Sequence, residues 1–367
     1  MDELHAYLRL LVQNNGSDLF LSSGSRPMVK VQGTLRPLSE VPLPPGEVKR
    51  LADALMNGQR QREFEANLES DFAVELTQLG RFRFNVFQQR GEVSLVARHV
   101  KSQIPTLAEL MMPAALHRLV MLKRGLVLVV GAAGCGKSTT LAAMLDYRNR
   151  TAPGHILTIE DPIEFLHPHH QCVVDQREVG LDTRSFEEAL RHGLREAPDV
   201  IMIGEIRDEL TMQQAMKYAE TGHLCLATLH ASNANQAVDR MINFFPQAAR
   251  RQALLDLSLN LQGVVAQRLI HGLRGRMVPA TELMLHSAYI AELIQKGEID
   301  EIKPAIAKSL DQGMHTFDQS LYELYVNGDI GLAEALEHAD SHTDLSLRIR
   351  MHAGVRPGSA AGITLQP

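Results

Sequence analysis

The segment from Gly131 to Ser138 has the residue types and spacing of a phosphate-binding loop. It reads Gly-Ala-Ala-Gly-Cys-Gly-Lys-Ser, which fits the pattern G-x-x-x-x-G-K-[ST]. Glycines let backbone N–H groups turn inward around a phosphate, and the N-terminus of a following helix adds the positive end of its dipole. Lys137 is expected to reach the β- and γ-phosphates, and the Ser138 hydroxyl to take one Mg²⁺ coordination position. The motif predicts binding of ATP or GTP with Mg²⁺, through Gly131, Gly134, Cys135, Gly136, Lys137, Ser138 and Thr139.

Acidic residues follow an apolar run that reads as a strand. Glu160, Asp161 and Glu164 come just after the run from His155 to Ile159. In an open parallel sheet the carboxyl ends of the strands face the ligand, so a carboxylate that activates water belongs there. The alternative is a helix N-terminus with acidic residues and a proline in its first turn, which needs no catalytic function.

A second acidic position ends the apolar run from Val200 to Ile203. A Walker B strand ordinarily ends in Asp, and here Gly204 and Glu205 occupy that place. Glu205 is therefore the candidate for holding Mg²⁺, through a water molecule. Asp199 precedes the run and lies at the wrong end for this role.

A histidine and two arginines are further candidates. His230 ends another apolar run, where it fits either a hydrogen-bonded structural residue or a catalytic residue near the γ-phosphate. Side chains alternate along a strand, so Arg81 and Arg83 share one face while Phe82 and Phe84 share the other. That pattern fits a solvated strand over a core, and it equally fits phosphate clamping by arginine, so the spacing leaves both open.

The elements that must position these residues form successive regions. Residues 1–100 mix short helices with paired strands and predict a small α+β domain. Residues 101–113 contain two prolines and read as a linker. Residues 114–285 alternate β and α, which predicts an α/β domain with a parallel sheet covered on both faces. Residues 286–345 read as helices, and residues 346–367 as a disordered tail.

Composition narrows the classes of function. The chain has 367 residues, which favours two or three domains, and 45% of the residues are hydrophobic. The formal net charge of −6 gives no overall basic field for nucleic acid. Three cysteines without a C-x-x-C pair disfavour a zinc ribbon or a disulfide framework and favour a reducing compartment. The acidic N-terminus, and the lack of an apolar run of about 20 residues, predict a cytoplasmic protein without a membrane span.

Four motifs in a fixed order give the chain a family resemblance. The phosphate loop is followed by Thr158–Glu164, Val200–Arg207 and Glu220–His230, which resemble the Asp box, Walker B motif and His box of secretion ATPases. More narrowly, the chain resembles the type IV pilus retraction ATPases PilT and PilU, to about residue 345. The family's extension ATPases and the type II secretion ATPases carry a tetracysteine zinc motif and a longer N-terminus. This chain has neither, which favours retraction.

The resemblance implies a PAS-like N-terminal domain, a RecA-like P-loop ATPase domain and a helical C-terminal extension, assembled as a homohexameric ring. It implies Mg²⁺-dependent ATP hydrolysis that drives pilus retraction and twitching motility. The implied location is cytoplasmic, at the inner-membrane base of the pilus. The implied partners are a paralogous retraction ATPase and the inner-membrane platform protein, with no nucleic acid.

The resemblance also implies roles for individual residues. Glu164 matches the catalytic glutamate, and Glu205 matches the Walker B glutamate. His223 and His230 match the His box. This match implies that His223 binds the nucleotide and that His230 is catalytic. Three arginines match those of the N-terminal domain that close on the phosphates, namely Arg81, Arg83 and Arg98.

Departures from the PilT pattern favour the accessory paralogue PilU. Where PilT has an Ala-Ile-Arg-type motif, this chain has Tyr289–Lys296, and the stretch Leu226–Ala237 is similar to PilU. The phosphate loop has Ala133 and Cys135 where Thr or Ser is usual. Cys135 lies at a helix N-terminus beside Lys137, which favours a reactive thiolate, although it also fits a small side chain that the loop tolerates.

Two other classes of function are open from the sequence. RecA-like rings also move along nucleic acid, but the chain lacks a basic stretch interleaved with aromatic residues. A nucleotide-binding scaffold without hydrolysis is the other class, and the presence of both Glu164 and Glu205 disfavours it.

Overall fold

The computed structural model describes residues 2–31, 33–77, 79–100 and 103–354. It divides into two compact units. The first comprises Met1–Gln103 with Ile163–Leu166, and the second comprises Ile104–Pro162 with His167–Pro367. The boundary near residue 103 falls within the segment predicted as a linker.

The first unit is built on a six-stranded antiparallel sheet in the order β3-β2-β1-β6-β5-β4. Its helices are α1 (Asp2–Gln13), α2 (Glu47–Asp53) and α3 (Gly58–Asn67). Its strands are β1 (Asp18–Ser22), β2 (Met28–Val31), β3 (Thr34–Pro37), β4 (Glu69–Leu76), β5 (Gly80–Gln89) and β6 (Glu92–His99). The α+β arrangement expected for this region is what the structure has.

One face of this sheet is apolar and the other carries arginine. Phe82 and Phe84 of β5 are fully buried, whereas Arg81 and Arg83, which alternate with them along the strand, are half-buried. Arg98 of β6 lies directly opposite Arg83 in the antiparallel register and therefore shares its face. The alternation predicted for this strand is confirmed.

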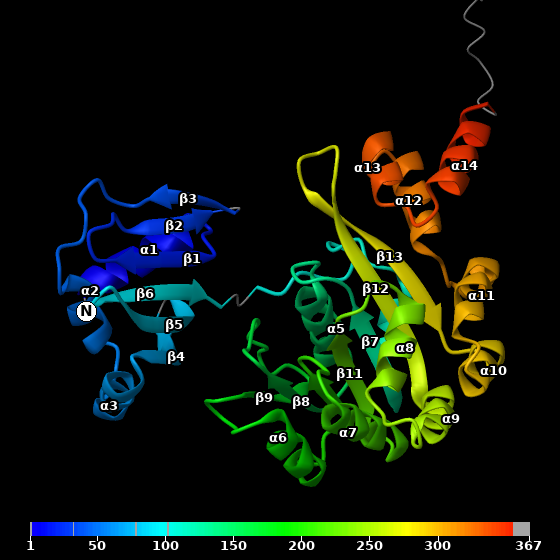
Figure 1. Cartoon of the computed structure of the whole chain (residues 1–367), viewed down its shortest axis with the longest axis horizontal. Coiled ribbons are helices and arrows are strands. Elements are labelled where there is room, and N and C mark those ends of the chain that lie inside the picture. The colour runs from blue at the N-terminus through cyan, green and yellow to red at the C-terminus, as the bar shows by residue number, and fades with distance from the viewer. Residues whose placement is uncertain (1, 32, 78, 101–102, 355–367) are drawn as a thin grey trace, which may run out of the picture. The chain divides into compact units, whose positions relative to one another are not determined.

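The second unit contains a seven-stranded sheet in the order β13-β12-β7-β11-β10-β8-β9. All neighbouring strands are parallel except β12 and β13, which form a long antiparallel hairpin (Figure 1). The bounds are β7 (Gly125–Val130), β8 (Gly154–Glu160), β9 (Cys172–Glu178), β10 (Val200–Ile203), β11 (Leu224–Leu229), β12 (Leu261–His271) and β13 (Met277–Leu285). The associated helices are α4 (Ala115–Val120), α5 (Lys137–Thr151), α6 (Phe186–Gly193), α7 (Glu209–Glu220), α8 (Ala234–Asn243) and α9 (Arg250–Asn260).

This sheet is covered on both faces, as a parallel sheet requires. Along β7, Leu126, Leu128 and Val130 join one buried apolar cluster, while Val127 and Val129 join the other. Because β7, β8, β10 and β11 run parallel and in register, their carboxyl ends meet at one edge of the sheet. The segments that follow these ends are the phosphate loop and the other motifs found in the sequence.

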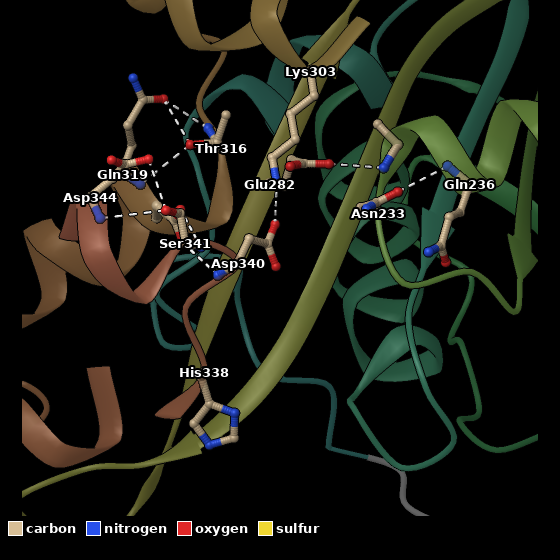
Figure 2. Close-up of polar contacts among 12 residues, drawn as sticks. Asn233, Gln236, Glu282, Lys303, Thr316, Gln319, His338, Asp340, Ser341 and Asp344 are labelled. Atoms are coloured by element: carbon tan, nitrogen blue, oxygen red, sulfur yellow. Dashed lines mark hydrogen bonds and ion pairs between the residues drawn. The ribbon is translucent and has the colours of Figure 1, made fainter. Parts of the chain in front are cut away.

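The C-terminal region is helical, with α10 (Ala288–Lys296), α11 (Ile302–Lys308), α12 (Phe317–Val326), α13 (Leu332–Glu337) and α14 (His342–Gly354). Asp340 links it to the sheet, since its carboxylate lies 2.8 Å from Arg268 Nη2 of β12. The same carboxylate lies 2.7 Å from Lys303 Nζ of α11 (Figure 2). The expectation of disorder from residue 346 is wrong for residues 346–354. Leu345 and Ile349, four residues apart on α14, are both buried against the core and hold this helix in place. The rest of the predicted tail, residues 355–367, lies outside the described residues.

Candidate functional site

The phosphate loop joins the end of β7 to the start of α5. Gly131 has φ of 151° and Gly136 has φ of 92°, both in the region that favours glycine. A Cβ on Gly131 would lie 2.4 Å from Cys135 Sγ and 2.6 Å from the Gln267 carbonyl oxygen, so a side chain there would collide with the loop's own packing. Ala132, Ala133 and Gly134 are exposed at the tip of the loop. The loop therefore has the strand–loop–helix context that the motif requires.

Lys137 is the first residue of α5, and its ammonium group lies over the loop. Nζ donates hydrogen bonds of 2.9 Å to the carbonyl oxygens of both Gly131 and Ala132. Ser138 and Thr139 follow in the first helical turn, and both are half-buried. A cation and a set of backbone N–H groups are thus gathered at one helix N-terminus, which suits an anion.

Cys135 is buried, which bears on its predicted reactivity. Its side chain is 6% exposed. Burial raises the pKa of the Cys135 thiol, although the nearby charge of Lys137 acts in the opposite direction. Since the raised pKa leaves little thiolate at neutral pH, the structure favours Cys135 as a small side chain packed against Gly131 rather than as a reactive thiol.

We expect thiol-alkylating reagents to modify Cys135 slowly in the folded protein at neutral pH, and Cys135→Ser to keep normal ATPase activity. Mass spectrometry of the alkylated sites after a timed exposure tests the first part. Cys172 and Cys225 are also buried, so all three thiols should react slowly in the folded protein and rapidly once it is denatured. Rapid inactivation that Mg-ATP prevents and Cys135→Ser abolishes would restore the reactive-thiol interpretation.

The Walker B segment forms a charged network at the same edge of the sheet. Glu205 Oε2 accepts a 2.7 Å hydrogen bond from Arg207 Nε, and Glu205 Oε1 lies 3.1 Å from His230 Nε2. Arg207 Nη1 in turn lies 3.5 Å from Asp161 Oδ2. Residues from the ends of three parallel strands, β8, β10 and β11, therefore meet in one network.

Gly204 lets the ends of β8 and β10 approach each other closely beside this network. Its N–H donates a 2.8 Å hydrogen bond to the Ile159 carbonyl. A Cβ on Gly204 would lie 3.2 Å from the same oxygen and 3.3 Å from Glu160 Cα, so a larger residue would push β8 and β10 apart. The buried Thr228 hydroxyl donates to the Gly204 carbonyl and fixes the turn that carries Glu205.

The segment after His230 is held by a buried carboxylate. Glu282 of β13 is fully buried, and its Oε1 accepts a 2.8 Å hydrogen bond from the N–H of Ala234, the first residue of α8 (Figure 2). The Asn233 side chain caps the same helix by accepting from the Gln236 N–H. Burial raises the pKa of Glu282. Together these contacts define where α8 begins and thereby constrain the loop that carries His230.

The carboxylates of the Asp box differ in their surroundings. Glu160 is 8% exposed, and its Oε1 accepts hydrogen bonds from Thr158 Oγ1 at 2.6 Å and Gln176 Nε2 at 3.1 Å. Glu164 is exposed, and the structure gives it no hydrogen bond or ion pair with the residues it describes. Glu164 therefore lies outside the network of Glu205 and His230, as a solvent-accessible carboxylate.

His223 lies at the opposite end of β11 from His230. It precedes Leu224, whose register partner is Gly125 at the start of β7, whereas the phosphate loop follows Val130 at the far end of that strand. At about 3.3 Å per strand residue, the two ends are roughly 17 Å apart. The strand register therefore separates His223 from the phosphate loop of the same chain, and a contact between His223 and nucleotide stays a prediction. The His223 ring instead lies 3.1 Å from Thr221 Oγ1 and packs edge-on against a tyrosine.

The three candidate arginines lie in the first unit. Arg98 Nε donates a 2.7 Å hydrogen bond to the buried Asp18 carboxylate, while 65% of the Arg98 side chain remains exposed. Arg83 Nη2 lies 3.8 Å from the exposed Asp71 carboxylate, a distance at which an ion pair contributes little. Arg81 and Arg83 emerge from the same face of β5. The three arginines are thus grouped on one sheet face, where the Arg98 side chain remains largely exposed.

Comparison with known proteins supports the assignment of these motifs. Residues 4–303 match the family of type II/IV secretion system proteins. PilU, a type IV pilus ATPase of Pseudomonas aeruginosa, is 51% identical over 350 residues, which are 95% of this chain and 92% of that protein. This chain belongs to the type II/IV secretion system protein family, among the type IV pilus ATPases of the PilT and PilU type.

Two PilT proteins of this family also match this chain over nearly its full length. PilT of Pseudomonas aeruginosa, a type IV pilus retraction ATPase, is 42% identical over 90% of this chain and 96% of its own. A crystal structure of the pilus retraction motor PilT with bound ADP superimposes with a TM-score of 0.86, at 39% identity over 93% of this chain and 98% of that one. Identity is higher to this PilU than to this PilT, as the departures in the sequence predicted. No helix of the pilus ATPase, among the described residues, is long and apolar enough to cross a membrane.

Some residues at the site of this pilus ATPase were not indicated by the sequence. Arg207 joins Glu205 to Asp161, and Gln267 of β12 contacts the phosphate loop. A cavity of about 160 Å³ lies beside the start of α5. Its lining includes Thr139 and Gln267. Apolar side chains also line it, among them Met112 before α4, Leu269 of β12 and Met277 of β13. Most of these residues come from β12, β13 and the segment before α4, which carry no recognisable motif.

Proposed function

We propose that this chain is a cytoplasmic, homohexameric, Mg²⁺-dependent ATPase that couples ATP hydrolysis to type IV pilus retraction in twitching motility, as an accessory motor of the PilU type. The observation that carries the proposal is that a phosphate loop and a Glu205–His230 pair follow the carboxyl ends of neighbouring parallel strands. That pair supplies a carboxylate and an imidazole beside a cation, Lys137, at the end of the neighbouring strand. Identity of 51% to a type IV pilus ATPase supports the same activity.

The donor groups at this edge fit Mg²⁺. The Ser138 hydroxyl and the Glu205 carboxylate are oxygen donors, which Mg²⁺ prefers. Within the described residues there is no cluster of three or more His, Cys, Asp or Glu side chains that could hold a metal ion. This suits an ion bound mainly by phosphate and water, with few protein ligands. At this position Glu205 would orient the water ligands of Mg²⁺, and the ion would supply charge neutralisation at the phosphates.

The chain's own residues divide the remaining tasks of hydrolysis. Backbone N–H groups of Gly134 to Ser138 bind phosphate oxygens, and Lys137 balances charge on the transferring phosphoryl group. Glu164 accepts a proton from the attacking water, since it is a solvent-accessible carboxylate. His230 adds a hydrogen-bonding group beside Glu205. The apolar cavity beside Thr139 takes the nucleobase of ATP.

The proposal extends to assembly and partners. The first unit, an antiparallel sheet with three helices within its described residues, is proposed to be a PAS-like domain, and the second a RecA-like motor domain. The proposed partners are identical subunits in a ring, a paralogous retraction ATPase and the platform protein at the inner-membrane base of the pilus. Arg81, Arg83 and Arg98 contribute positive charge to the phosphates during hydrolysis.

Arg83→Ala is expected to lower ATP hydrolysis by about tenfold or more, because an arginine that stabilises phosphate charge acts in the transition state. Thermal stability should hardly change, since Arg83 is half-buried and its ion pair to Asp71 spans 3.8 Å. Arg36→Ala, at an exposed arginine on β3 of the same sheet, is the control. Steady-state ATPase assays and thermal melts test the prediction. A marked loss of stability with normal activity would instead favour a solvated strand face.

A single-turnover ATPase assay on the purified assembly, with and without its paralogue, tests the proposed function. We expect slow hydrolysis alone and faster hydrolysis with the paralogue, together with a hexameric mass in solution. Stimulation of hydrolysis by DNA would support a nucleic-acid motor instead. Nucleotide binding without any turnover, under both conditions, would support a scaffold.

A further inference from the structure

Gln267 contacts the phosphate loop from a strand more than a hundred residues away in the chain. It lies on β12 next to Ala266, whose register partner on β7 is Val130, so Gln267 is level with Gly131. Its side chain is 2% exposed. Its backbone carbonyl lies against Gly131, and its Nε2 would be 3.0 Å from a Cβ on Gly136. One residue thus borders both ends of the loop.

The amide of Gln267 makes two hydrogen bonds, and both partners belong to the loop or to the first turns of α5. Nε2 donates to the Cys135 carbonyl, and Oε1 accepts a 2.9 Å hydrogen bond from Thr140 Oγ1. A carbonyl needs a donor, so only this orientation of the amide satisfies both partners. A helical threonine commonly donates to the carbonyl four residues earlier, but the Thr140 hydroxyl donates to Gln267.

The bond to Cys135 sets the direction of a phosphate-binding group. In a planar trans peptide the C=O of one residue and the N–H of the next point in opposite directions. Since the Cys135 carbonyl points to Gln267 on β12, the N–H of Gly136 points away from β12, into the loop. That N–H belongs to the set that would cradle a phosphate.

We propose that Gln267 is a positioning residue for nucleotide binding. It fixes the Cys135–Gly136 peptide and the N-terminal part of α5, so that the loop N–H groups and Lys137 are set for phosphate before nucleotide arrives. This rests on the proposed function, because it assumes that the loop binds a nucleoside diphosphate or triphosphate. The fixed geometry reduces the ordering that binding would otherwise require.

Gln267→Met tests the proposal, because methionine has a similar length and volume but makes neither hydrogen bond. Leaving the buried Cys135 carbonyl and Thr140 hydroxyl unsatisfied is expected to weaken binding of a fluorescent ADP analogue about tenfold or more. Gln262→Met is the matched control, since Gln262 lies at the other end of β12, near Gly125. We expect it to change the affinity less than about twofold.

Gln267→Glu is expected to make the affinity for the ADP analogue depend on pH. A purely structural role of Gln267 would produce no such dependence. Above its pKa the carboxylate can accept from Thr140 but repels the Cys135 carbonyl, and below its pKa the protonated acid can serve both partners. Burial should raise that pKa toward the neutral range. Affinity for the ADP analogue, relative to the unsubstituted chain at the same pH, should therefore improve about threefold or more from pH 8 to pH 6.

The outcomes separate this proposal from the proposed function. ADP affinity within about twofold of the unsubstituted chain in Gln267→Met, or a pH-independent and normal affinity in Gln267→Glu, would overturn the positioning role. If Gln267→Met does not fold, Thr140→Val removes one of the two bonds and should weaken ADP binding about threefold. Failure of the unsubstituted chain to bind the analogue would count against the proposed function instead.

Discussion

Lys137→Ala is expected to lower ATP hydrolysis by about 10³-fold or more and to weaken nucleotide binding. The substitution removes the cation that balances charge on the transferring phosphoryl group. In the structure, Lys137 Nζ already lies at the loop, bonded to the Gly131 and Ala132 carbonyls. In the proposed hydrolysis this charge would stand where phosphate charge develops, which is the condition for a large effect on the transition state.

Lys123→Ala is the matched control for this prediction. Lys123 is exposed in the turn before β7, at the opposite end of that strand from the phosphate loop. Steady-state and single-turnover ATPase assays, together with binding of a fluorescent ATP analogue, measure both effects. Lys123→Ala should match the unsubstituted chain in each assay. Unchanged turnover in Lys137→Ala would rule out the phosphate loop as the site of hydrolysis.

The parts of the site that the sequence predicted are local in the chain. The phosphate loop is a contiguous motif, and its glycines Gly131, Gly134 and Gly136 all have positive φ, which glycine adopts readily. Glu205 and His230 were found because each ends an apolar run, and parallel strands in register bring such ends together. These predictions needed only the positions at which the apolar runs end and the expectation that their strands run parallel.

The parts that the sequence did not predict depend on contacts between distant segments. Gln267 reaches Cys135 because β12 adds to the sheet beside β7, and nothing in its own neighbourhood indicates that pairing. The separation of His223 from the phosphate loop has a related cause. It belongs to the same motif as His230, but the strand between them carries the two histidines to opposite ends of the sheet. A motif gives the order of residues, whereas the strand register decides which of them meet.

The N-terminal region illustrates the same limit. The alternation of Arg81 to Phe84 correctly predicted one charged face and one buried face. The pairing of Arg98 with Asp18 depends on β1 and β6 lying side by side, although 80 positions separate the two residues. Sequence periodicity thus gives the face of a strand but not its neighbour.

Glu164→Gln is expected to bind Mg-ATP normally while losing about 10²-fold in turnover, because an amide cannot accept the proton of the attacking water. Glu164 is exposed and makes no hydrogen bond or ion pair within the described part of the chain. The substitution should therefore leave the melting temperature unchanged, so that lost turnover reports on chemistry alone. Glu187→Gln, at an exposed glutamate in the first turn of α6, is the control for a change of charge.

Glu205→Gln is expected to differ from Glu164→Gln in two respects. Glu205 lies 2.7 Å from Arg207 Nε and 3.1 Å from His230 Nε2, so its neutralisation should disturb the network and lower the melting temperature. If Glu205 also orients the water ligands of Mg²⁺, half-maximal activity should require a higher Mg²⁺ concentration, whereas Glu164→Gln should leave that requirement unchanged. A Mg²⁺ titration of turnover in both variants, with thermal melts, separates the two roles. Small and equal effects in the two variants would mean that neither glutamate has the role assigned to it, and that another carboxylate, such as Asp161, must be considered.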